Sequence, residues 1–177
     1  MARELLRAAS NRDANRWTGF AAVVFAAIAS FGLVSCNTTG VGFDYERAVA
    51  RFVIETENNG SIVTMPVSGA RIQVNPTAVL TEFDIESVSV AEVEMGPCLQ
   101  FTLTRLASRT FYQATANNQG RRMILVINGQ PIGLKRIERP VADGIFHVFV
   151  EIPNADLPEL ATNLRGTSLE IQNKIRG

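Results

Sequence analysis

The chain contains a single histidine, His147, and only two cysteines, Cys36 and Cys98, among its 177 residues. This inventory is too small for a zinc site built from several histidine and cysteine ligands. Lysine and arginine together number 17, as do aspartate and glutamate, so the net charge is zero and no basic surface for nucleic acid is indicated. We therefore expect no metal, no cofactor and no nucleic-acid partner.

Catalytic motifs are equally scarce. His147 lies in an alternating stretch between Phe146 and Val148, which is typical of a structural histidine in a strand. A Ser-His-Asp arrangement stays open by count alone, but no Gly-x-Ser-x-Gly elbow is present. Glu92 and Glu94 share one face of a predicted strand, and we interpret them as its solvated side. The sequence thus predicts a protein that is not an enzyme and has no catalytic residues.

A long apolar run extends from Trp17 to Val34. As a helix it would reach about 27 Å, at about 1.5 Å per residue, against a bilayer core of about 30 Å. No later apolar run is long enough to span a membrane. Basic residues before the run keep the start of a signal on the cytoplasmic side. These residues are Arg3, Arg7, Arg12 and Arg16. The run predicts either a cleaved signal peptide or an uncleaved membrane anchor.

The apolar run ends on Leu33-Val34-Ser35-Cys36, which resembles the lipobox of bacterial lipoprotein signal peptides. The resemblance implies that residues 1–35 are removed as a signal peptide and that the thiol of Cys36 carries a diacylglyceryl group. Small side chains within the run and the polar residues after Cys36 favour this interpretation over an uncleaved helix. Two acyl chains anchor a protein stably, whereas one holds it only marginally. We expect a lipid-anchored protein at the cell membrane that faces the periplasm or the outside, in the inner or the outer membrane.

The remainder of the chain is predicted to form a tether and one domain. Residues 36–48 contain Gly40 and Gly42 and little apolar periodicity, so we predict a flexible tether there. Residues 49–177 are enough for one domain with one core. If Cys36 carries lipid, Cys98 has no partner for an internal disulfide, and we interpret it as a small buried side chain.

Two hydrophobic periodicities follow one another in this domain. Alternating or continuous apolar stretches predict strands over residues 50–57, 62–65, 70–74, 88–95, 99–103, 123–127, 132–137 and 145–152. Helical spacing predicts one helix after Thr104 that ends at Gly120. Its predicted inner face consists of Leu106, Ala107, Phe111, Ala114 and Thr115. A second helix should begin at Asp156 and stop at Gly166. We favour a closing strand over residues 167–172, with a continued helix as the alternative.

Turn residues indicate how the strands are joined. Asn58-Asn59-Gly60, Asn128-Gly129 and Asp143-Gly144 each combine residues that tolerate positive φ with glycine. Tight turns of this kind join antiparallel neighbours. The sequence therefore predicts an α+β sandwich, in which a mostly antiparallel sheet carries two helices on one face.

Residues 79 to 172 resemble the head of the first periplasmic region of SecD, the bacterial protein-export subunit. The resemblance rests on Leu99-Gln-Phe-Thr-Leu-Thr104, Phe111, Thr115, the stretch from Gly120 to Gly129, Ile137, Pro140-Val141 and Asp143-Gly144. It implies a ferredoxin-like α+β module that engages extended polypeptide or docks against an envelope or export partner. The transmembrane helices that couple the proton gradient to export in that family have no counterpart after Cys36. We therefore do not expect this chain to perform that step alone.

Strand addition is the mechanism by which such a module would bind an extended chain, because an edge strand offers unpaired N–H and C=O groups. The weak strand over residues 132–137 is our candidate edge. Its candidate binding residues are Ile132, Leu134, Lys135 and Arg136. The alternative is an ordinary edge that Pro131 and the basic residues protect against aggregation. Correspondingly, the alternative function is a structural or assembly lipoprotein without transport activity, anchored by lipid or by an uncleaved helix.

Overall fold

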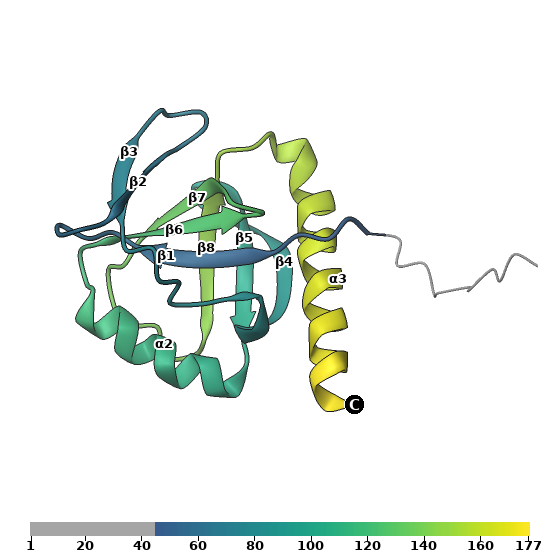
Figure 1. The fold of residues 1–177 in the computed structure, drawn as a ribbon. Coiled ribbons are helices and arrows are strands. Elements are labelled where there is room, and N and C mark those ends of the chain that lie inside the picture. The colour runs from purple at the N-terminus through teal and green to yellow at the C-terminus, as the bar shows by residue number, and fades with distance from the viewer. Residues whose placement is uncertain (1–44) are drawn as a thin grey trace, which may run out of the picture. The chain divides into compact units, whose positions relative to one another are not determined.

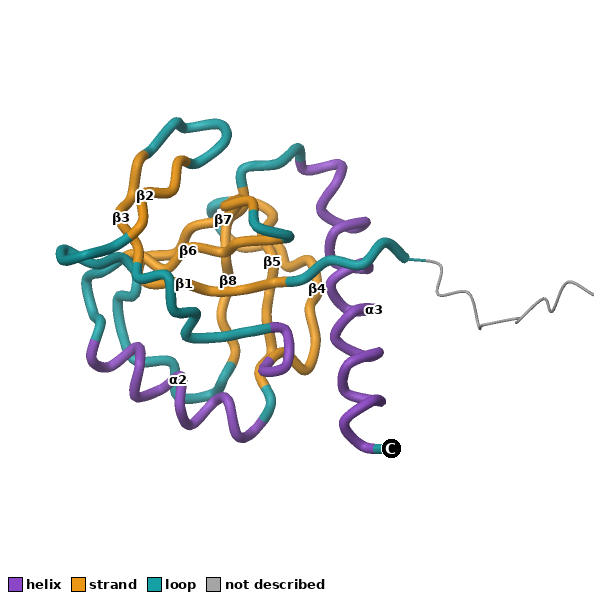
Figure 2. Tube along the Cα trace, in the orientation of Figure 1, coloured by secondary structure: helices purple, strands orange, loops and turns teal. Residues whose placement is uncertain are grey.

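A computed structural model describes residues 45–177. The predicted signal peptide, the lipidation site Cys36 and most of the predicted tether lie outside these residues. The described part forms an α+β domain around a curled, six-stranded antiparallel sheet (Figures 1 and 2). Its strands lie in the order β1-β6-β7-β8-β5-β4. The bounds are β1 Ala50–Ile54, β4 Ile85–Val93, β5 Gly96–Leu103, β6 Arg122–Ile127, β7 Gln130–Arg136 and β8 Ile145–Val150.

A separate two-stranded sheet consists of β2 (Ser61–Thr64) and β3 (Arg71–Val74). The turn before β2 has Asn59 at φ 49°, as the asparagine and glycine residues there predict. Backbone bonds attach β3 to the end of β1: Thr56 donates to Gln73 and Asn75 donates to Ile54, each at 2.9 Å. The β2–β3 hairpin therefore projects from the body but is joined to it along one side (Figure 1).

The β6–β7 hairpin turns at Asn128-Gly129, where both residues have positive φ, 49° and 85°. This confirms the strongest turn predicted from the sequence. The register shifts between Leu125 and Val126, and Val126 lies opposite Pro131. A shift of this kind lets a strand accept proline, which cannot donate a ladder hydrogen bond.

Helix α2 (Arg105–Asn117) follows β5 as predicted. The hydroxyl of Thr104 caps it by accepting a bond from the Ala107 N–H at 3.3 Å. Ala107, Phe111 and Thr115 are buried, but Leu106 is 77% exposed and does not belong to the inner face. The chain leaves the helix through Gly120 at φ 85°, as predicted.

The last helix, α3, extends over Leu157–Arg176, so the predicted stop at Gly166 and the favoured closing strand over residues 167–172 are wrong. The continued helix is the alternative that holds. α3 runs alongside the outer edge of β4 (Figure 1). The 3-10 helix η1 (Glu82–Asp84) and the 3-10 helix η2 (Asn154–Asp156) precede β4 and α3.

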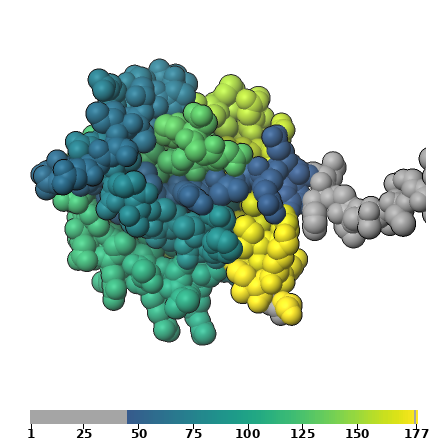
Figure 3. Space-filling model, in the orientation of Figure 1, coloured from purple at the N-terminus to yellow at the C-terminus, as the bar shows by residue number. Residues whose placement is uncertain are grey.

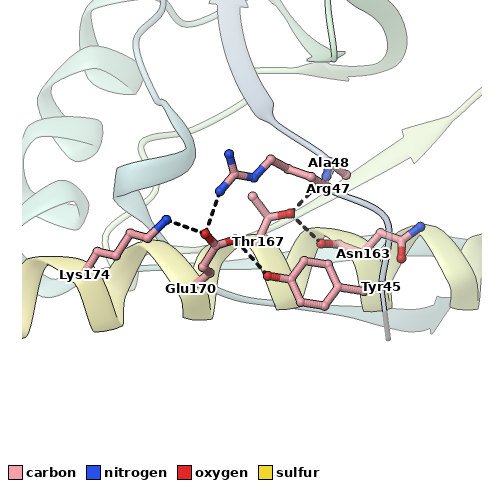
Figure 4. A network of polar contacts seen from close by, with 7 residues as sticks. All are labelled: Tyr45, Arg47, Ala48, Asn163, Thr167, Glu170 and Lys174. Atoms are coloured by element: carbon pink, nitrogen blue, oxygen red, sulfur yellow. Dashed lines mark hydrogen bonds and ion pairs between the residues drawn. The ribbon is translucent and has the colours of Figure 1, made fainter. Parts of the chain in front are cut away.

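Gly166 lies inside α3 because another part of the chain occupies the space of its missing side chain. A Cβ at this position would lie 2.5 Å from ring carbons of Tyr45. Residues 45–48, here called the N-terminal segment, follow the helix surface at this place (Figures 3 and 4). These residues belong to the predicted tether, but the structure places them against α3. Within the described part of the chain, residues 45–48 thus already contact the domain, upstream of residue 49.

Polar bonds at helical spacing hold the N-terminal segment (Figure 4). The backbone N–H of Glu46 donates to Asn163 at 3.0 Å, and that of Ala48 donates to the hydroxyl of Thr167 at 3.0 Å. Glu170 accepts bonds from Tyr45 Oη, Arg47 and Lys174. The three contacted helix positions lie on one face, because residues three and four apart are neighbours on a helix.

Two apolar clusters lie on opposite sides of the sheet. The main core contains four phenylalanines whose ring centroids lie 5.0–5.5 Å apart, from β1, β5, α2 and β8. They are Phe52, Phe101, Phe111 and Phe146. The second cluster lies beneath the β2–β3 hairpin and consists of Val53, Met65, Ile72, Val74 and Ile124. Both helices contribute to the main core, which agrees with the prediction of two helices on one face.

The ferredoxin-like part of the prediction is not confirmed. That arrangement repeats a strand-helix-strand unit in the order βαββαβ. Here five strands precede α2, three strands follow it, and α3 comes last. Within residues 45–177, no helix combines the length and the apolar composition needed to cross a bilayer.

Candidate functional site

The predicted candidate edge, β7, is an interior strand. It pairs with β6 on one side and with β8 on the other. Gly133 permits the second pairing, because a Cβ there would lie 2.9 Å from Val150 and 3.0 Å from Val148. The prediction was wrong because the glycine that weakens an isolated strand is what lets β8 approach.

Ile132, Leu134, Lys135 and Arg136 have different surroundings. Ile132 packs against the main core and Leu134 against the second cluster. Arg136 is exposed, and Lys135 is half-buried at the rim of a cavity. The structure therefore does not bring these four residues together as one binding surface.

A cleft opens where β7 and β8 separate. The two strands pair at only two positions, Gly133 with Val150 and Leu134 with Phe149. Beyond them lies a cavity of about 540 Å³, here called the β7–β8 cleft. Its lining includes Lys135, Glu138, Arg139, Ala142, Asp143, Ile145 and His147. Cationic and anionic groups thus occur together in a cleft within the sheet.

Part of the β8 backbone faces this cleft. The Glu151 N–H donates to the Ile132 carbonyl of β7 at 2.7 Å, and on the other side the Leu103 N–H of β5 donates to the Gly144 carbonyl at 2.9 Å. Because alternate residues of a strand face alternate neighbours, the peptide groups of Phe149 and His147 point toward β7. Phe149 has a β7 partner and His147 has none. The cleft therefore offers a strand edge that lies inside the sheet.

A second cavity, here called the α2 groove, has a volume of about 700 Å³. It lies between α2 and the adjoining ends of β5 and β8, with Arg105, Arg109 and Tyr112 on the helix side. Ala142, Asp143 and Ile145 line both cavities. The β7–β8 cleft and the α2 groove thus meet at residues 142–145.

The loop between the two cavities is held by a buried hydroxyl. Thr115 is 1% exposed, and its Oγ1 accepts a bond from the Val141 N–H at 3.0 Å while donating to the Phe111 carbonyl at 2.8 Å. Asp143 accepts a bond from the Ile145 N–H at 3.0 Å. Gly144 approaches α2 so closely that a Cβ would lie 2.0 Å from the Ser108 Oγ. This loop is therefore fixed at both its start and its end.

The edge that sequence reasoning missed is β2. Among the described strands it has one neighbour, β3. The signal was available, because Ser61-Ile62-Val63-Thr64 contains neither charge nor proline, the residues that usually protect an edge. The outer sides of the other terminal strands are partly occupied, since α3 lies along β4 and Leu80 bridges to Phe52 of β1.

His147 and Cys98, the remaining candidate residues, lie within strands of the sheet and contact neighbouring strands. His147 Nε2 lies 3.1 Å from the Gln100 amide oxygen of the neighbouring strand. Cys98 is fully buried, and burial raises the pKa of its thiol, as does nearby Glu92. Within residues 45–177, no group of three or more histidine, cysteine or acidic residues is placed to hold a metal ion.

Comparison with known families decides the relationship of this domain. The model of the SecDF P1 head subdomain matches residues 59–171. The chain belongs to this family. The match begins upstream of the stretch that the sequence resemblance indicated, so it includes the β2–β3 hairpin. The resemblance to the SecD head is thereby confirmed, together with the α+β class.

Two solved SecDF structures share the fold. One, described as a membrane component that enhances protein export, is 21% identical with a TM-score of 0.55, and the match covers 70% of this chain and 64% of that chain. The other, a crystal structure of SecDF in a super-membrane-facing form, is 22% identical with a TM-score of 0.57. That match covers 70% of this chain and 19% of the SecDF chain. This chain therefore matches less than two thirds of either structure. A search of curated protein sequences found no match.

Proposed function

We propose that this protein is an extracytoplasmic module, held at the membrane through Cys36, that engages extended polypeptide beside the protein-export machinery. Membership of the SecDF P1 head family supports the association with export. The observation that carries the binding role is the β7–β8 cleft, where two strands of one sheet separate and expose the peptide group of His147.

The shape and chemistry of the cleft suit an extended chain. An unpaired strand segment gives backbone hydrogen bonds that do not depend on the sequence of the ligand. The lining combines Lys135 and Arg139 with Glu138 and Asp143, so the cleft can accept both positively and negatively charged side chains of a bound polypeptide. The adjoining α2 groove provides room for the chain to continue past residues 142–145. These properties fit a client that varies in sequence.

Attachment through Cys36 would hold the binding domain near the membrane surface. Eight residues lie between Cys36 and Tyr45, and the nine steps from one to the other, at about 3.3–3.6 Å each, span at most about 32 Å. A domain attached in this way stays close to the membrane surface from which an exported chain emerges. Mass spectrometry of the purified protein tests the attachment, since a diacylated N-terminal Cys36 is expected and an intact N-terminus with a free thiol would contradict it.

Site-specific crosslinking of the full chain in intact cells tests the binding role. A photoreactive residue at Ala142, where both cavities meet, should capture secretory chains that have not folded. The same residue at Asn173, which is exposed on α3, serves as the matched control. One fixed envelope partner at Ala142 would support the structural or assembly lipoprotein instead. Equal capture at both positions, or none at either, would contradict the proposal.

A further inference from the structure

The outer edge of β2 is a strand edge with its hydrogen-bonding groups turned away from the protein. The Met65 N–H donates to the Ala70 carbonyl at 2.9 Å, which places Met65 on the side of β3. Alternation then turns the peptide groups of Val63 and Ser61 toward β3 and those of Ile62 and Thr64 outward. Two residues therefore present both an N–H and a C=O to a further strand.

This edge is short, but it has no charge, proline or bulge to protect it against pairing. Natural proteins cover edge strands or give them charge, proline or a bulge. The β2–β3 register is continuous across all four residue pairs, and β2 carries no charge and no proline. Ile62 is 59% exposed. A short, uncharged edge without a second neighbouring strand is thus present on the surface of the described domain.

The hairpin that carries the edge is held in place before any ligand arrives. Glu151, which follows β8, accepts bonds from the backbone N–H groups of Val67 at 2.8 Å and Ser68 at 3.0 Å. Met65 and Ile72 are each 1% exposed and anchor the hairpin in the second cluster. A preformed edge requires less ordering on binding than a flexible one, which favours affinity.

We propose that β2 is a docking edge that accepts an extended, uncharged strand from another polypeptide, which becomes the third strand of the β2–β3 sheet. This surface is separate from the β7–β8 cleft and does not depend on binding there. The absence of charge on β2 specifies the partner, because a charged strand would lose solvation at this edge without gaining an opposite charge.

A second copy of this chain fits the edge less well than a foreign strand does. A two-fold axis at Ile62 would pair Ile62 with its own copy and Gly60 with Thr64, whereas an axis at Val63 or Thr64 brings Pro66, which has no N–H, into the pairing. Two copies can therefore pair fully in one short register only. A stable interface also needs about 20–30 residues a side, and β2 has four. An extended chain is not bound by two-fold symmetry and can take any register along the outward positions of β2.

A labelled peptide tests the docking edge on the full chain in detergent micelles. The probe is an acetylated and amidated hexapeptide of alternating threonine and valine, followed by fluorescence anisotropy. Ile62→Pro removes an outward N–H but no bond to β3, and it should weaken binding at least tenfold. Ile62→Thr keeps the backbone donor and a β-branched side chain, and it should bind within about threefold of the wild type. Thr64→Lys keeps every backbone group and should also weaken binding, because it adds charge to the edge.

Amide exchange at Val63 and Met65, whose N–H groups face β3, reports whether each variant keeps the hairpin. Loss of peptide binding with unchanged exchange supports the docking edge. Equal binding by the wild type and Ile62→Pro, no binding by the wild type, or a dimer of the full chain that Ile62→Pro abolishes would overturn it. Ala142→Trp fills the meeting point of the two cavities and removes binding of the probe to the cleft, so the comparison of wild-type and Ile62→Pro edges is repeated in this background. Binding that Ala142→Trp retains and the added Ile62→Pro abolishes belongs to β2. Binding that Ala142→Trp alone abolishes belongs to the cleft and overturns the docking edge.

Discussion

The ring of Tyr45 lies directly on the backbone of Gly166, 121 positions later in the chain. A Cβ on Gly166 would come within 2.5 Å of the ring atoms Cγ and Cδ1. The glycine is therefore neither a helix stop nor a flexible joint. It is the place where α3 accepts the aromatic side chain of the N-terminal segment.

Gly166→Ala should destabilise the domain by about 1 kcal/mol or more, because the added methyl group displaces a packed ring. In a Tyr45→Ala background the same substitution should instead stabilise by about 0.5–1 kcal/mol, since alanine is the better helix former. Denaturant unfolding of the four proteins measures this reversal. Equal effects of Gly166→Ala in both backgrounds would show that the ring and the glycine do not depend on one another.

Glu170 should make the stability of the domain depend on pH in the acid range. Bonds from Lys174, Arg47 and Tyr45 lower the pKa of this carboxyl from 4.5 to about 2. A lowered pKa stabilises the folded state above about pH 4.5, and the contribution disappears as the pH falls toward 2. Thermal unfolding between these values should fall more steeply for the wild type than for Glu170→Gln. Glu159→Gln on the same helix is the control and should retain the wild-type slope.

Glu151 should fix the tip of the β2–β3 hairpin. Burial raises the pKa of Glu151, but bonds from Ser68 and Val67 outweigh burial and hold it below its usual 4.5. The attachment should therefore weaken as the pH falls below about 4.5. Glu151→Ala should speed amide exchange at Val67 and Ser68 at least tenfold at neutral pH. Glu151→Gln keeps one acceptor oxygen, so its exchange rates at these two amides should lie between those of the wild type and Glu151→Ala. Unchanged exchange in Glu151→Ala would contradict the attachment.

Thr115→Val should destabilise the domain by about 1–3 kcal/mol, because it removes the acceptor of the Val141 N–H inside the protein. Thr115→Ser keeps the hydroxyl and should cost clearly less. Chemical denaturation separates the two variants, and exchange of the Val141 amide shows whether the loop loosens. A loss of stability that is equal in both variants would assign the effect to the missing methyl group rather than to the hydrogen bond.

Local signals predicted most of the individual elements. Thr104 caps α2 as expected, and the asparagine-glycine turn after β6 adopts the expected positive φ values. Capping and turn formation depend on residues close together in sequence, so single-sequence reasoning is sufficient for them. The same holds for Met123 to Ile127, whose continuous apolar run became a central strand.

Errors occurred where distant residues decide the outcome. Gly166 reads as a helix end until Tyr45 is known to lie on it. Pro131 and Gly133 read as signs of an edge until the register shift and the approach of Val150 are known. The β7–β8 cleft has no local signature either, since it arises from the separation of two strands that local patterns predict equally well. The free edge of β2 was readable from its composition and was overlooked.

The attachment of the N-terminal segment to α3 also sets an order of events during synthesis. The bonded residues lie 117 to 125 positions apart. A ribosome releases the beginning of the chain first, so Tyr45 and Arg47 lack their helix partners until residues 163–170 have emerged. The ring of Phe52 likewise meets Phe146 only late. Folding of this domain can therefore finish only after α3 has been synthesised. In a nascent chain that stops before Asn163, residues 45–48 lack their partners on α3, so the segment before β1 is not held in place.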